Sequence, residues 1–141
     1  MSEASFWDYL RVRLPKDIHY SRIESDTCPG FPDVHYTLDR ETGTIELKDA
    51  KLPAGKYPFS GKSGLRDSQL NWMDDELASG GRVLLALQKH NEIYILRANV
   101  NYRMLSTMTL RQIETASLLR WMKRSEPDNL TKLLYDTLIS L

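Results

Sequence analysis

The segment at 82–88, RVLLALQ, is a nearly continuous apolar run, and this feature constrains the fold of the chain more than any other. Such short apolar runs are typical of a central strand that is covered on both faces of its sheet. A second strand is predicted at 92–97, because a polar turn at 89–91 separates the two segments. Residues 65–79 carry apolar side chains at spacings of three and four and are followed by two glycines, which predicts a helix. The chain therefore contains a sheet with at least one covering helix.

The N-terminal half predicts one more helix and three more strands. Residues 3–13 place apolar side chains on one helical face, and residues 17–24 have the composition of a short strand. The segments 33–38 and 44–50 are the predicted arms of a hairpin, with residues 39–43 as its turn.

The C-terminal third predicts two further helices, at 109–123 and 127–141. Thr109 can cap the first of them, and Pro127 suits the first turn of the second. The predicted order, α-β-β-β-α-β-β-α-α, is typical of an α/β protein in which helices flank a mixed central sheet. A chain of 141 residues is long enough for one such domain with an ordinary core.

Two carboxylates and one ammonium are predicted to meet on one side of the hairpin. Side chains alternate between the two faces of a strand, so Glu46 and Lys48 point the same way, and Asp33 can face Glu46 from the preceding arm. Carboxylate oxygens together with the backbone carbonyl of Leu47 suit a hard divalent cation such as Mg²⁺ or Mn²⁺. Lys48 can orient an attacking water or neutralise charge on a phosphate. This combination predicts metal-dependent phosphodiester hydrolysis.

Each of these motifs also has an ordinary structural interpretation. Pro-Asp is a common turn dipeptide, and Glu-x-Lys occurs on the exposed face of many strands. It is the order of the features that favours a functional site: Asp33 after a Gly-x-Pro turn, Glu46 and Lys48 in the next strand, and a helix-strand unit after them.

The motif Gly-Phe-Pro-Asp at 30–33, followed by Ile-Glu-Leu-Lys at 45–48, resembles the PD-(D/E)xK nuclease superfamily. More narrowly, it is similar to the VRR-NUC branch and to archaeal-type Holliday-junction resolvases. The resemblance extends over residues 1–97, and it implies an α/β restriction-endonuclease-like fold. Within a single nuclease domain, residues 1–97 would be the catalytic core and residues 98–141 a C-terminal helical extension that matches no motif.

The resemblance also implies roles for individual residues. Asp33 and Glu46 would be the metal ligands, and Lys48 would be the catalytic lysine. Gln69 would supply an amide that enters the site from the helix. Family members often add an acidic residue from the first helix, for which Glu3 is the candidate and Glu24 a competitor. Glu3 could equally be a negative charge that is favourable in the first turn of a helix.

The resemblance implies a structure-specific endonuclease whose substrates are Holliday junctions or other branched DNA. Cutting both strands of a junction requires two active sites, hence a homodimer. The C-terminal segment could supply the interface or could simply cover the sheet with its apolar residues Leu118, Leu119, Leu133, Leu134, Leu138 and Ile139. The alternatives are a nuclease for flaps, ends or a specific sequence, and a catalytically silent module that binds nucleic acid or protein. The presence of Asp33, Glu46 and Lys48 together argues against a silent module.

The net charge of zero excludes DNA binding through the overall electrostatic field of the molecule. The chain has 19 basic and 19 acidic residues, so DNA binding must depend on a local basic surface. The predicted DNA-binding cations are Lys51, Lys56, Lys62 and Arg66, interleaved with the aromatic Tyr57 and Phe59. A solvated loop is an equally good interpretation of this segment.

The remaining composition predicts a cytoplasmic protein. Cys28 is the only cysteine, so no intrachain disulfide can form, which suits a reducing compartment. The N-terminus has no basic segment followed by an apolar run, and no apolar stretch approaches the roughly 18 residues of a membrane span.

Overall fold

The computed structural model describes residues 3–23, 30, 32–50, 57–59, 65–98 and 102–140, with the side chains of residues 3, 102 and 103 excepted. The helices are α1 (Glu3–Arg11), α2 (Asp67–Ala78), α3 (Leu110–Ala116) and α4 (Leu130–Ile139), and two short 3₁₀ helices are η1 (Tyr102–Thr107) and η2 (Lys123–Ser125). The strands are β1 (His19–Arg22), β2 (Val34–Leu38), β3 (Glu41–Ala50), β4 (Val83–Lys89), β5 (Glu92–Arg97) and β6 (Leu119–Met122).

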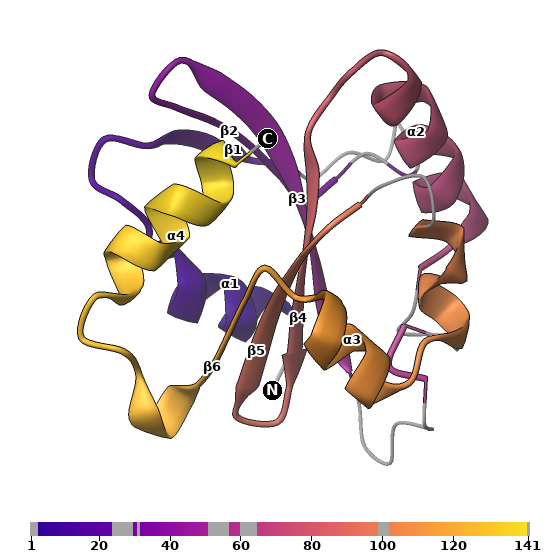
Figure 1. Ribbon diagram of the computed structural model, residues 1–141. Coiled ribbons are helices and arrows are strands. Elements are labelled where there is room, and N and C mark those ends of the chain that lie inside the picture. The colour runs from indigo at the N-terminus through magenta and orange to yellow at the C-terminus, as the bar shows by residue number, and fades with distance from the viewer. Residues whose placement is uncertain are drawn as a thin grey trace.

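The described strands form one six-stranded sheet in the order β1-β2-β3-β4-β5-β6. Neighbouring strands are antiparallel except for β3 and β4, which are parallel because α2 returns the chain to the starting edge between them. Helices α1 and α4 cover one face of the sheet, and α2 and α3 cover the other (Figure 1). This mixed sheet between helical layers confirms the predicted α/β fold class, in which helices flank a mixed central sheet.

Five elements between residues 1 and 97 follow the prediction closely. The observed limits agree with the predicted ones to within two residues for α1, β1, α2, β4 and β5. Apolar side chains of β3 and β4 separate onto the two faces, so Leu47 and Leu84 join the cluster under α1 and α4, whereas Leu85 joins the one under α2 and α3. Among the described residues, no helix is both long enough and apolar enough to span a membrane.

The turn between β2 and β3 is shorter than predicted. Leu38 pairs with Glu41, so only Asp39 and Arg40 lie between the strands, and their positive φ angles of 49° and 66° are those of a type I′ turn. β3 therefore has ten residues and begins at Glu41, three residues before the predicted arm. The predicted five-residue turn at 39–43 is wrong.

The predicted helix at 109–123 is wrong beyond Ala116. Thr109 caps α3 as expected, because its side chain accepts the N–H of Gln112. At Ser117 the backbone becomes extended, and β6 then pairs with β5 through Trp121 and Ile93. Burial of Trp121 against the sheet favours the extended conformation over another helical turn. The extension at 98–141 thus contributes a strand to the central sheet.

The last helix begins later than predicted, at Leu130, and Pro127 precedes its first turn. The C-terminal end of α4 is held by one side chain from β2 and one from the residue before β4. The hydroxyl of Tyr36 donates to the carbonyl of Leu138 over 2.7 Å, and Nε of Arg82 donates to that of Ser140 over 2.8 Å. Of the C-terminal apolar residues, Leu134 and Leu138 are buried in the core under α1 and α4, with Leu119 and Ile139 packed against it. α4 therefore covers the sheet.

Candidate active site

Glu46 and Lys48 lie next to one another on the face of β3 that α2 covers. They alternate with Ile45 and Leu47, which belong to the core on the opposite face, so the predicted period of two is confirmed. Both charged side chains are buried, with 2% and 5% of their surfaces exposed. Nζ of Lys48 lies 3.7 Å from Oε1 of Glu46, and this ion pair provides each buried charge with an opposite one.

Gln69 connects the two charged residues from the first turn of α2. Its Nε2 donates to Oε1 of Glu46 over 2.6 Å, and its Oε1 accepts from Nζ of Lys48 over 3.1 Å. The same Oε1 accepts the backbone N–H of Arg66 over 2.9 Å. Only this orientation of the amide satisfies all three contacts, because the carboxylate needs a donor and the ammonium needs an acceptor. The side chain is 4% exposed, so the amide is held inside the site.

Asp33 reaches the same point from the residue before β2. Its Oδ2 accepts the backbone N–H of Leu47 over 2.7 Å, so the carboxylate lies beside the peptide between Glu46 and Lys48. The backbone carbonyl of Asp33 accepts the N–H of Ile23 over 2.7 Å, which fixes the segment against the end of β1. The structure thus brings Asp33, Glu46, Lys48 and Gln69 together.

Gly30 is a positioning residue whose contact the motif alone did not reveal. Its φ of +87° is in the left-handed region, and a Cβ atom there would lie 2.0 Å from the carbonyl oxygen of Ser68 and 2.9 Å from the nitrogen of Gln69. The chain before Asp33 therefore packs directly on the first turn of α2. This close approach keeps Gln69 and Asp33 in register with each other, and only glycine allows it.

The donor set fits a hard divalent cation. Asp33 and Glu46 supply carboxylate oxygens and Leu47 supplies a backbone carbonyl, which are the ligand types that Mg²⁺ and Mn²⁺ prefer. Within the described part of the chain, no three His, Cys, Asp or Glu side chains form a metal cluster, so a third protein ligand would be a backbone carbonyl or an acidic side chain elsewhere. Glu3 starts α1, but its side chain, like Glu24, lies outside the described residues.

The predicted DNA-binding segment is described only in part. Lys51, Lys56 and Lys62 lie outside the described residues, and Arg66 is exposed directly before α2. Phe59 is completely buried in the core under α2 and α3, so the suggestion that it lies along DNA is wrong.

Comparison with known proteins gives a single kind of match. No family model and no curated protein matches the chain. Among solved structures, the chain is similar to Hjc of Archaeoglobus fulgidus, a Holliday junction resolvase from an archaeal hyperthermophile. The identity is 13%, the alignment covers 67% of this chain and 72% of that chain, and the TM-score is 0.44. At this level of similarity, the chemistry of the chain has to be inferred from Asp33, Glu46, Lys48 and Gln69 themselves.

Proposed function

We propose that this protein is a metal-dependent DNA endonuclease that hydrolyses phosphodiester bonds, with branched DNA such as a Holliday junction as its substrate. The observation that carries the proposal is the meeting of four polar side chains at one point: Glu46, Lys48 and Gln69, which are buried, and Asp33, which is half-buried beside them. Burying charged groups is costly, and proteins retain such groups mainly where they serve chemistry.

Asp33, Glu46 and the carbonyl of Leu47 would hold Mg²⁺ or Mn²⁺. When bound, such an ion polarises a phosphodiester and lowers the pKa of a water molecule in its coordination shell. Lys48 gives one hydrogen bond to Gln69, and an ammonium has three donors, so others are available for a water or a phosphate oxygen. The lysine would thereby orient the nucleophile or stabilise negative charge that develops on the phosphate.

Gln69 would act as a positioning residue. It holds the ammonium of Lys48 and one oxygen of Glu46 at fixed places, which leaves less reorganisation for the reaction itself. Rotation of either side chain would break at least one of these bonds, so the amide couples the positions of Glu46 and Lys48.

A homodimer is part of the proposal, because symmetric cuts at a junction need two sites at a fixed separation. The interface would use a surface other than the buried part of α4, since Leu134 and Leu138 already pack against the sheet.

The test is a cleavage assay on linear duplex, flap, fork and four-way junction DNA, with Mg²⁺, with Mn²⁺ and with chelator. We expect metal-dependent cutting that is strongest on the junction and that is lost in Asp33→Asn and Glu46→Gln. Asp136→Asn on α4 is the matched control, because it neutralises an exposed acid away from the site. Wild-type cutting by either site variant would refute the site assignment. Preference for flaps, for ends or for one sequence would replace the junction substrate, and binding with no cutting of any DNA would favour the silent module.

A further inference from the structure

The edge of β3 that carries the site has no partner strand among the described residues. β2 pairs with β3 only as far as Val34 and Ile45, whereas β3 continues to Ala50 on the side of β4. Asp33 stands where the two strands part, with its carboxylate on the N–H of Leu47. A nucleic-acid strand that reaches the site would pass the residues that border this fork, from β1 on one side and from α2 on the other.

Arg22 borders the fork from β1. It pairs with Val34, and the next residue, Ile23, donates its N–H to the carbonyl of Asp33, so Arg22 lies one strand from the site, with its side chain on the face of the sheet that α1 covers. Its Cζ lies 6.0 Å from the ring centroid of Trp7, and Tyr20 packs edge-on against the same ring at 5.3 Å. The guanidinium is therefore positioned by packing against α1.

Among the described residues, the guanidinium of Arg22 has no acidic partner. No described carboxylate forms an ion pair with its guanidinium, and its Nη1 is buried without a hydrogen-bond acceptor. A buried donor that lacks an acceptor is costly, and a fixed cation without an acid is ready to receive an anion from outside the protein.

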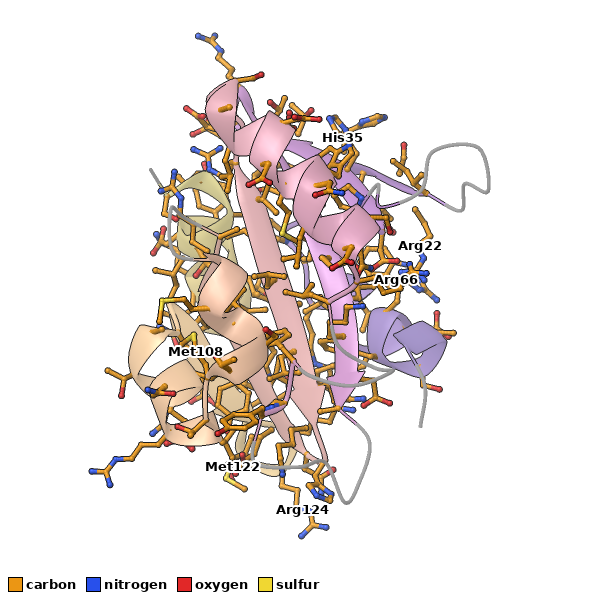
Figure 2. The ribbon with its side chains drawn as sticks, turned by 90° about the vertical axis from the view of Figure 1, so that its right-hand side faces the viewer. Arg22, His35, Arg66, Met108, Met122 and Arg124 are labelled. Atoms are coloured by element: carbon orange, nitrogen blue, oxygen red, sulfur yellow. The ribbon has the colours of Figure 1, made fainter. Side chains whose placement is uncertain are left out.

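Arg66 borders the fork from the opposite side. It precedes α2 with an extended backbone, and its N–H binds the amide oxygen of Gln69, which places it one hydrogen bond from the site. Its side chain is exposed, and no described carboxylate forms an ion pair with it. Figure 2 shows Arg22 and Arg66 labelled on the same side of the molecule, whereas Arg124 lies at the far end.

We propose that Arg22 and Arg66 bind two phosphates of the DNA backbone, one on each side of the phosphodiester that enters the site. This phosphate clamp rests on the proposed function. A guanidinium presents paired N–H donors in a plane and matches the oxygens of a phosphate better than an ammonium does. The clamp also explains how a molecule with no net charge can bind a polyanion at one place.

The test measures binding separately from cutting. A fluorescein-labelled four-way junction is titrated with protein in Ca²⁺, and anisotropy is recorded over a series of salt concentrations. We expect Arg22→Gln and Arg66→Gln each to weaken binding by about tenfold or more, and each to reduce the slope of log K against log salt by about 0.9. Arg124→Gln, which removes the same charge from an exposed arginine, leaves the affinity and the slope unchanged.

Arg22→Lys separates the charge from the shape of the side chain. It should keep the salt slope and lose part of the affinity, because an ammonium retains the charge and not the planar donors. In Mg²⁺, the arginine variants should raise KM more than they lower kcat, a split that a merely misfolded enzyme does not produce. Circular dichroism checks that each variant is folded. If Arg22→Gln is unfolded, the binding titration of Arg66→Gln alone tests the clamp.

Three results would overturn the clamp: wild-type affinity and slope in both glutamine variants, equal weakening by Arg124→Gln, or a loss of kcat with KM unchanged. The proposed function fails in a different way. The proposed function would be refuted if the wild-type protein cut no DNA in Mg²⁺ or Mn²⁺. The phosphate clamp would still hold if Arg22→Gln and Arg66→Gln weakened junction binding as expected.

Discussion

Gln69→Ala offers a quantitative test of the site, because the chain contains a matched control. Gln69 and Gln112 both lie in the first turn of a helix, and the amide oxygen of each accepts the N–H of the residue three positions earlier, over 2.9 Å from Arg66 and 2.8 Å from Thr109. Gln112 is exposed and has only this role, whereas Gln69 also binds the buried Glu46 and Lys48. The difference between the two alanine variants therefore isolates the contribution of the two contacts with charged groups.

The expected magnitudes follow from these contacts. Loss of the shared helix-end bond costs about 1 kcal/mol or less, which is the whole effect for Gln112→Ala. Hydrogen bonds to charged groups contribute about 1.5–3 kcal/mol each, and water that enters the vacated space recovers part of that. We therefore expect Gln69→Ala to lower the free energy of unfolding by about 3 kcal/mol, roughly 2 kcal/mol more than the control.

Urea unfolding followed by tryptophan fluorescence measures both variants, with the slope m checked for constancy. The cleavage rate of Gln69→Ala should fall as well, since Lys48 and Glu46 lose their common partner, whereas Gln112→Ala should cut at the wild-type rate. Equal losses of stability in the two variants would refute the reasoning, because Gln69 would then serve only to end its helix.

Three other perturbations follow from the structure. Lys48→Ala should still bind Mn²⁺ in calorimetry but lose most of its cleavage rate, whereas Lys132→Ala on α4 is the exposed control. Loss of metal binding with intact turnover in Lys48→Ala would contradict these roles. Gly30→Ala should destabilise the fold by several kcal/mol in urea, because a Cβ atom meets the backbone of Ser68; a change below about 1 kcal/mol would contradict the close approach. Burial raises the pKa of Tyr36 to about 12, so its contribution to stability is complete below about pH 10 and is lost as pH rises towards 12; Tyr36→Phe should flatten that decline in thermal unfolding.

Part of the site could be predicted from the sequence because it depends on local geometry. Glu46 and Lys48 share a face of β3 as a consequence of strand alternation, whatever the rest of the fold does. The position of Gln69 is different, since its bonds to these residues join positions 21 and 23 apart, and only the motif resemblance indicated it. Nothing local in the sequence indicated that strand pairing would place Arg22 opposite Val34, the residue that follows Asp33.

The errors have physical causes of the same kind. The apolar residues at 118–122 fit a helical and an extended pattern equally well, and pairing of Trp121 with Ile93 decides between them. Asp39-Arg40 is not the Asn-Gly or Asp-Gly pair that usually marks a type I′ turn, so the sequence did not indicate the two-residue hairpin turn.

The docking of α4 has a consequence for how the protein is made. The bond from Tyr36 to the carbonyl of Leu138 joins residues 102 positions apart, and Leu134 and Leu138 complete the core that contains Val34. A ribosome adding about 5–20 residues per second needs several seconds to synthesise the part of the chain after β5. During that interval the residues of the site have already been synthesised, but α1 alone covers the face of their sheet that α4 will complete. The nascent chain therefore exposes an apolar surface that chaperones or neighbouring chains can bind, and folding is completed only when the last helix arrives.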